Sequence, residues 1–267
     1  MDNLYLLILS CMALGAVVGF LAGLLGIGGG IVAVPVLIYL LPLAGFSAEN
    51  VPHVAIATSL AAIILTSFSS ATAHHRRGNI PWPLFKFVLP GLVLGAISAG
   101  FISQRFSATL LQQTFALFVI FMAIQMIFPF KVKESRKSLP SGGGLFIASL
   151  LIAIIAAMMG IGGGILLIPF LAWCGLQLRE AIGFSSASGG VIALFGSASY
   201  VMAGWNISGL PEWTLGFVYL PALVGVVMTS VVMAPLGVKA ASVWPTPVLK
   251  KIFALLLIIV GVKLALT

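Results

Sequence analysis

Two copies of one glycine cluster are the residues of this chain whose spacing points to chemistry. Gly26-Ile27-Gly28-Gly29-Gly30 recurs letter for letter as Gly160-Ile161-Gly162-Gly163-Gly164, and a proline follows each copy at the same distance, at Pro35 and Pro169. Glycines let a ligand approach the backbone closely, and a helix that starts after them points unpaired N–H groups at the ligand. Such a site suits a small anion. The alternative is that the glycines only allow helices to pack closely.

Hydroxyl side chains form a second set of candidates. Ser59, Thr66 and Ser70 fall on one helix face, and Ser185 repeats Ser59 at a spacing of 126 residues. Hydroxyls donate to anions, but in membrane helices they also bond to the preceding turn or to a neighbouring helix. The predicted substrate-binding residues are therefore the last three glycines of each cluster and the two matched serines: Gly28, Gly29, Gly30, Ser59, Gly162, Gly163, Gly164 and Ser185.

The composition decides what kind of element carries these residues. Of the 267 residues, 61% are hydrophobic and only 7% are charged, and the mean hydropathy is +1.24. A soluble domain carries about 25% charged residues. This chain has too few charges to cover a water-exposed surface, so its surface must face the lipid bilayer. Long apolar runs follow one another along the chain, which predicts an all-α polytopic membrane protein. The net charge of +8 resides in short loops, so we expect no nucleic-acid partner.

The two glycine clusters divide the chain into two repeats. We expect residues 1–130 to form the first membrane repeat, 131–143 a cytoplasmic linker and 144–267 the second repeat. Each repeat is predicted to hold a glycine-broken helix or hairpin followed by three transmembrane helices. The expected spans after the breaks are 53–73, 84–104 and 110–128, then 181–203, 215–236 and 248–265.

The positive charges predict how the repeats lie in the membrane. If each broken segment returns to its starting side, 11 of the 13 Lys and Arg residues share one side, which the positive-inside rule makes cytoplasmic. Both termini then lie outside, and the second repeat runs inverted relative to the first. The two half-helix N-termini would meet near the middle of the membrane, with Gly29 and Gly163 close to the centre.

Several kinds of chemistry lack the residues they need. No Asp or Glu falls within a predicted span, which argues against a proton relay or cation site made of buried carboxylates. We expect no catalytic residues, no metal and no cofactor, because neither HExxH nor GxSxG is present. Glu49 and Glu180 follow the glycines at about the spacing of a dinucleotide fingerprint, but no strand–turn–helix unit surrounds them.

The same residues resemble the TauE/SafE family of sulfite and organosulfonate exporters. The resemblance rests on 23-GLLGIGGG-30 with Pro35, 159-MGIGGG-164 with Pro169, 57-ATSL-60 and the basic loop 74-HHRRGN-79. It implies a secondary transporter that moves a small sulfur-containing anion, sulfite or an organosulfonate, across the cytoplasmic membrane. The alternatives are an anion channel or a transporter of another small solute, and then a membrane enzyme. A homo-oligomer is compatible with the sequence.

Overall fold

The computed structural model describes residues 2–25, 29–127, 139–243 and 246–266. Helices account for nearly all of its regular structure, and the short elements are two 3₁₀ turns and one two-stranded hairpin. In chain order the elements are α1 (Asp2–Leu25), α2 (Gly30–Leu40), η1 (Leu41–Ala44), α3 (Val51–Arg76), η2 (Trp82–Leu84), α4 (Phe85–Ser103), α5 (Ala108–Ile127), α6 (Gly142–Met158), α7 (Gly164–Trp173), α8 (Leu178–Gly204), β1 (Thr214–Leu215), β2 (Val218–Tyr219), α9 (Leu220–Val243) and α10 (Thr246–Leu266).

Six of the described helices are long and apolar enough to cross a bilayer. They provide candidate spans at Tyr5–Ala22, Val51–Arg76, Trp82–Ser103, Ala108–Ile127, Leu178–Gly204 and Leu220–Gly237. Both α2 and α7 are shorter apolar helices, at 11 and 10 residues, and each follows a glycine cluster. At a rise of about 1.5 Å per residue, neither could cross a hydrocarbon core of about 30 Å. The all-α polytopic fold expected from the sequence is confirmed.

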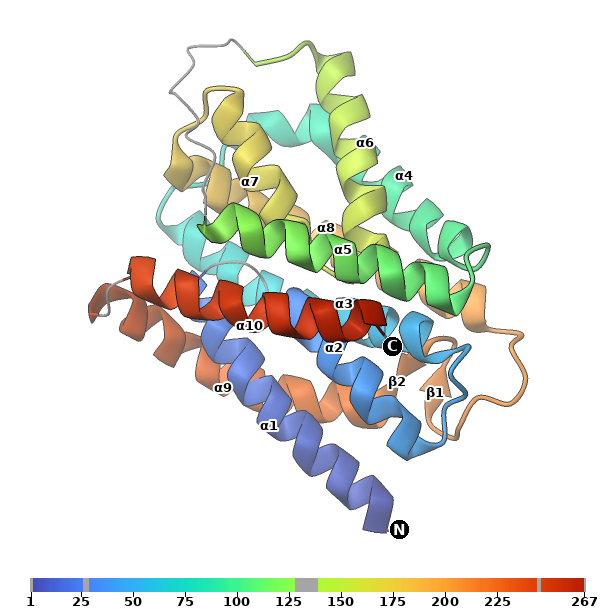
Figure 1. Ribbon diagram of the computed structural model, residues 1–267. Helices are drawn as coiled ribbons and strands as arrows, with labels where there is room; N and C mark the ends of the chain where they lie inside the picture. The colour runs from blue at the N-terminus through green and yellow to red at the C-terminus, as the bar shows by residue number, and fades with distance from the viewer. Residues whose placement is uncertain (1, 26–28, 128–138, 244–245, 267) are drawn as a thin grey trace.

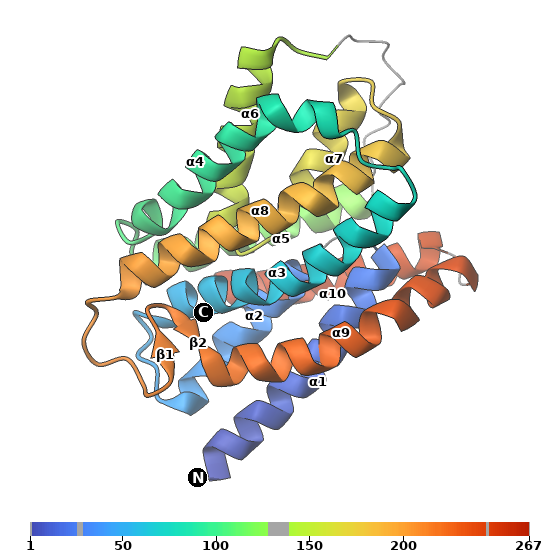
Figure 2. The same ribbon diagram turned by 180° about the vertical axis from the view of Figure 1, so that it is seen from behind.

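The helices of the two halves are interleaved. Helix α1 packs along α9, α4 packs along α6, and the long helices α3 and α8 lie side by side between these pairs (Figures 1 and 2). Helix α5 packs on α10 in the same manner. Each of these four pairs joins one helix from before the linker to one from after it, so neither half has a core of its own.

Small residues and shared hydrogen bonds explain the close pairs. A Cβ atom on Gly15 or Gly19 would overlap the backbone of α9, as the sequence predicts for this glycine face. The Thr229 hydroxyl of α9 then reaches across to donate to the Met12 carbonyl of α1 at 2.7 Å. The α4–α6 pair repeats this arrangement, since the Ser149 hydroxyl of α6 donates to the Val88 carbonyl of α4 at 3.0 Å.

One expected span is wrong at its start. A helix was expected from Leu215, but Thr214–Leu215 and Val218–Tyr219 form an antiparallel hairpin and α9 begins at Leu220. Gly216 adopts a positive φ of 56° at the turn, which a glycine accommodates without strain. The hairpin places Phe217, Val218 and Tyr219 in buried positions against the ends of α3 and α8.

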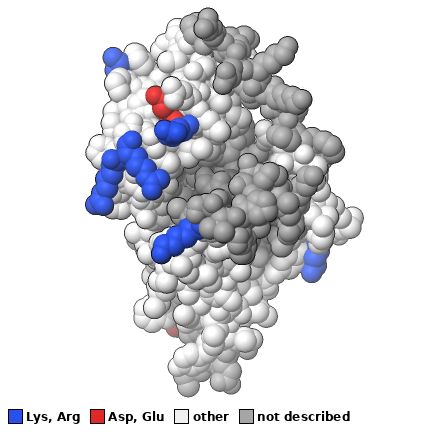
Figure 3. Space-filling view, turned by 90° about the vertical axis from the view of Figure 1, so that its left-hand side faces the viewer, with Lys and Arg blue, Asp and Glu red and all other residues white. Residues whose placement is uncertain are grey.

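The basic segments gather at one end of the molecule. The connection from α3 to α4, the beginning of α8 and the end of α9 lie on the left of Figure 1, whereas both termini point away from that end. Figure 3 looks onto this end and shows Lys and Arg side chains clustered there. We call it the basic end. The opposite end, which carries the hairpin, is called the hairpin end.

Candidate functional site

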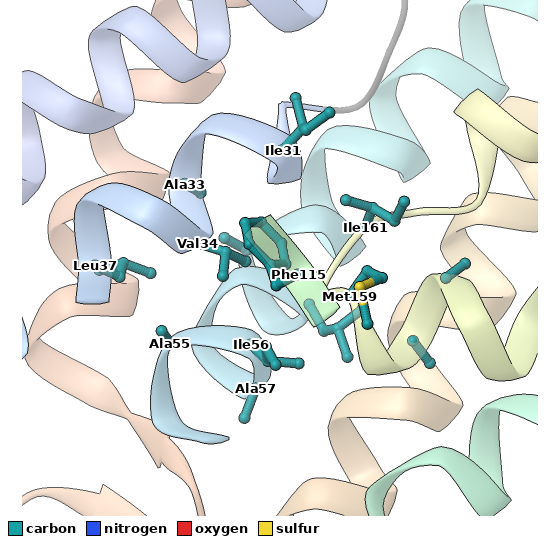
Figure 4. Packing of buried hydrophobic residues seen from close by; sticks show 14 of the residues in the cluster. Ile31, Ala33, Val34, Leu37, Ala55, Ile56, Ala57, Phe115, Met159 and Ile161 are labelled. Carbon is teal, nitrogen blue, oxygen red and sulfur yellow. The ribbon is translucent and has the colours of Figure 1, made fainter. Parts of the chain in front are cut away.

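The two helix breaks meet in the middle of the molecule. A Cβ atom on Gly30, the first residue of α2, would lie 2.5 Å from the Gly160 carbonyl oxygen in the second break. Figure 4 shows Ile31 and Val34 of α2 converging with Ile161 and Met159 of the second break. A glycine at position 30 is therefore required by this contact between the two breaks.

The caps of the two short helices have the same geometry. Gly29 precedes α2 with φ 71° and ψ −17°, and Gly163 precedes α7 with φ 71° and ψ −11°. Because this left-handed conformation strains any residue with a Cβ atom, both positions call for glycine for backbone reasons alone. Neither Gly29 nor Gly163 is among the described residues that line the cavity discussed next.

A cavity of about 570 Å³ opens between the halves on the basic side of the breaks. Helices α3 and α8 form its main walls, and α1, α9 and the second glycine cluster complete it. Its lining is rich in hydroxyl groups, which come from Thr66, Ser67, Ser69, Ser70, Ser185 and Ser186. The backbone of Gly162 and Gly164 lies beside them. Gly164 starts α7, so its N–H group has no acceptor within that helix.

Ser185 stands out among these hydroxyls. It is only 2% exposed, and its Oγ atom has no hydrogen-bond partner among the described residues. Other hydroxyls of the lining are paired: Ser70 donates to Ser186 at 3.1 Å, and Thr66 donates to the Ile63 carbonyl at 3.1 Å. A buried hydroxyl without a partner costs about 1–3 kcal/mol, which a bound ligand would recover.

Basic side chains surround the mouth of the cavity. His74 and Arg77 at the end of α3 and Lys239 near the end of α9 belong to its lining, and both Arg77 and Lys239 are exposed. Among the described residues of the lining, none is an Asp or a Glu. In the described part of the chain, no group of three His, Cys, Asp or Glu residues could hold a metal ion. The electrostatic character of this cavity therefore favours an anion over a cation.

The predicted site residues fall into four groups. Gly162, Gly164 and Ser185 line the cavity. Ser59 and Gly30 line a separate void of about 10 Å³, which shares Thr66 with the cavity but has room for at most one water molecule. Gly29 and Gly163 are helix caps. Gly28 lies outside the described residues.

Sequence reasoning missed the mouth of the cavity. Arg77 and Lys239 approach the cavity from its open side, and neither was among the predicted site residues. The signal was present in the first half, because Thr66, Ser70, His74 and Arg77 follow one another at steps of three or four residues along one face of α3. Nothing in the sequence indicated that Lys239 would join them.

The structure thus describes a multi-pass membrane protein with six potential spans, four of which contribute residues to a hydroxyl-lined cavity, as is typical of transporters. The chain belongs to the family described as "Sulfite exporter TauE/SafE", whose model matches residues 11–264. A probable membrane transporter protein of Haemophilus influenzae is 37% identical over 98% of this chain and 99% of its own length. The probable membrane transporter protein YdhB of Bacillus subtilis is 26% identical, over 97% and 99% of the two chains. A probable membrane transporter protein of Methanocaldococcus jannaschii is also 26% identical, over 88% and 87%. No solved structure matches the chain.

Proposed function

We propose that this transporter carries a small sulfur-containing oxyanion, sulfite or an organosulfonate, across the cytoplasmic membrane. The observation that carries the proposal is the cavity, in which unpaired Ser185 and the start of α7 lie at the inner end and Arg77 and Lys239 lie at the mouth. A sulfonate group or the sulfite dianion presents several acceptor oxygens and no donor, so hydroxyl and N–H groups can surround it. The volume of about 570 Å³ exceeds what one such anion needs, so water accompanies it.

The buried packing of α3 toward the hairpin end favours a carrier over a channel. Along α3 the cavity lining begins at Thr66, and the residues from Val51 to Leu60 are all buried. The Ser59 hydroxyl donates to the Gly160 carbonyl at 2.9 Å and ties α3 to the second break at this level. A channel needs a continuous path, whereas a carrier exposes its site to one side at a time. The structure then corresponds to the state that is open at the basic end.

An inverted-repeat architecture would allow a second state, in which the protein is open at the hairpin end. In this proposal the two halves are related by a two-fold axis in the membrane plane, and the basic end is cytoplasmic. The reciprocal packing of α1 on α9 and α6 on α4 supports it, since a two-fold exchange of the halves converts one pair into the other. The matched caps at Gly29 and Gly163 support it as well.

Flux into proteoliposomes tests the proposal. The full-length protein is reconstituted, and uptake of radiolabelled sulfite and methanesulfonate is followed against empty liposomes, with phosphate and taurine as competitors. Saturable uptake of either sulfur anion supports a carrier. Uptake that stays linear with concentration would indicate a channel, and no uptake of either anion would contradict the assigned substrate class.

A further inference from the structure

A second buried polar cluster lies at the hairpin end, far along α3 from the cavity. It comprises His53 at the start of α3, Ser103 at the end of α4 and Tyr200 near the end of α8. His53 is 6% exposed, Ser103 and Tyr200 are 0% exposed, and Phe217 of the hairpin packs against both rings. The Phe217 ring stacks on His53 with centroids 5.2 Å apart and meets Tyr200 edge-on at 6.5 Å.

Two polar atoms of this cluster lack partners. Neither His53 Nδ1 nor the Tyr200 hydroxyl makes a hydrogen bond of normal geometry within the described residues, although Tyr200 lies beside the Ser103 side chain. Buried polar groups are otherwise almost always paired, and each orphan costs about 1–3 kcal/mol. Phe217 therefore packs against two side chains, each of which has a buried polar atom whose hydrogen-bonding capacity is unused.

The hydrogen bond of His53 fixes what such a ligand must be. His53 Nε2 lies 3.1 Å from the Ser103 carbonyl oxygen, which can only accept, so Nε2 carries a hydrogen. Nδ1 is then a bare lone pair when the ring is neutral and an N–H donor when the ring is protonated. A lone pair repels an anion, so an anion can bind at Nδ1 only with the protonated ring.

Among the described residues, the hydrogen-bond and ring contacts of His53 are with the Ser103 carbonyl and the Phe217 ring, and neither is charged. The elements around His53 contribute Tyr200 from α8 and Tyr219 from the hairpin as their titratable groups, and Ser103 from α4. The charged residues nearest in the chain to these elements are Glu49, Arg105 and Glu212, and all three are exposed. Because a buried charge without a partner is costly, a protonated His53 requires an anion from outside the protein.

The repeat spacing relates this cluster to the open cavity. The 126 positions that separate Ser59 from Ser185 also separate His74 from Tyr200 and His53 from Arg179. His74 lines the open cavity, and Arg179 stands exposed at the basic end at the beginning of α8. Their matched residues at the hairpin end are buried beneath Phe217.

We propose that His53 and Tyr200 form a second anion-binding site, which the transported anion occupies together with a proton on His53 when the protein opens at the hairpin end. The site rests on the proposed function, because its ligand is the anion that the cavity delivers. Opening requires Phe217 to leave, and the hairpin that carries it is only two residues long in each strand. The proton enters and leaves with the anion, so transport couples to the proton gradient.

Paired flux measurements at two pH values test this site. Proteoliposomes with equal pH inside and outside, at pH 6 and pH 8, are loaded with unlabelled anion, and exchange of labelled sulfite is followed with methanesulfonate in parallel. The variants are His53→Gln, whose amide can still donate to the Ser103 carbonyl, and Tyr200→Phe. His75→Gln and Tyr5→Phe are the matched controls, because both side chains are exposed and lie outside the cavity lining. Size-exclusion profiles and unfolding temperatures establish that each variant is folded.

Dividing the parent flux by the variant flux isolates the contribution of His53. Any protonation of the anion itself affects both samples equally and cancels in this ratio. We expect the ratio for His53→Gln to be larger at pH 6 than at pH 8, because a lower pH favours the protonated ring to which the anion binds. Tyr200→Phe should lower exchange about tenfold at both pH values, as expected for a lost hydrogen bond to a charged ligand. The controls should match the parent.

The outcomes separate this site from the proposed function. If the parent exchanges neither anion, the proposed function itself fails. If the parent exchanges an anion and both folded variants match it at pH 6, the second site is refuted. A His53→Gln ratio that is equal at the two pH values refutes the proton on His53. If His53→Gln does not fold, Tyr200→Phe decides, because it keeps the ring and its packing against Phe217.

Discussion

Ser59 in α3 and Ser185 in α8 occupy matched positions in the two halves, yet their hydroxyl groups have different surroundings. The Ser59 hydroxyl donates a hydrogen bond to the Gly160 carbonyl across the interface between the halves. The Ser185 hydroxyl is equally buried but unpaired, and Ser185 belongs to the lining of the cavity. Two serines at matched spacing therefore differ in use: Ser59 ties the halves together, whereas Ser185 keeps an unused hydroxyl.

The largest expected effect concerns a feature that the halves share. Replacing Gly163 with Val would strain a backbone at φ 71° and place the new Cβ atom 2.5 Å from Ile192. We expect a loss of at least about 3 kcal/mol of stability, and Gly29→Val should behave alike because its cap has the same φ. The measurement is the yield of monodisperse protein and its unfolding temperature.

Gly143→Val is the control for these variants, since a Cβ atom at Gly143 meets nothing within 4 Å. Normal folding of Gly163→Val would mean that the cap is not a fixed element of the structure. Unequal effects at positions 29 and 163 would show that the halves differ at their breaks as well as at their serines.

The next largest effects are expected at the two serines, on anion binding for Ser185 and on stability for Ser59. Ser185→Ala should weaken anion binding about tenfold and leave the unfolding temperature equal or higher, because it removes an unpaired buried hydroxyl. Ser59→Ala should lower stability by about 1–2 kcal/mol and change affinity little, because it leaves the Gly160 carbonyl without its donor. Titration calorimetry with sulfite and thermal unfolding separate the two. Equal behaviour of the two variants would remove the distinction drawn between the serines.

A smaller, salt-dependent effect is expected at the cavity mouth. Arg77→Gln and Lys239→Gln should each reduce sulfite uptake several-fold at low ionic strength, because these exposed cations attract the anion to the opening. The loss should shrink when salt is raised from 20 to 300 mM, as the screening length falls. Arg105→Gln at the hairpin end is the matched control for uptake that enters by the basic end. A salt-independent loss would assign the two cations a direct contact with bound substrate.

The smallest effect is expected for a hydroxyl that already has a partner in the cavity wall. Ser70→Ala breaks the 3.1 Å contact with Ser186 between α3 and α8. Since Ser186 also donates to the Ile182 carbonyl, it keeps a partner, and the change in sulfite affinity should stay below about threefold. Ser98→Ala in α4 is the control, because that hydroxyl bonds only within its own helix. A tenfold loss for Ser70→Ala would make the whole hydroxyl lining, and not Ser185 alone, the anion contact.

The sequence predicts local features well in this protein and distant ones poorly. The helices, the two breaks and the close-packing face of Gly15 and Gly19 follow from hydropathy and residue size. The hairpin at Thr214–Tyr219 was not predicted, because its apolar residues continue without interruption into α9. The partner of Ser59 was beyond prediction, since it lies 101 residues away and depends on how the halves dock. For the same reason, the sequence did not indicate that Arg77 and Lys239 lie together at the mouth of the cavity.

The interleaved helices have a consequence for how the protein is made. Helix α1 is synthesised almost 200 residues before its main partner α9, which begins only at Leu220. Until α9 is inserted, the glycine face of α1 must rest against lipid or the insertion machinery. Assembly is therefore a late event, and truncation before α9 would leave an N-terminal helix without its principal packing partner. Two fragments divided at the linker should regain a folded protein only when they are produced together.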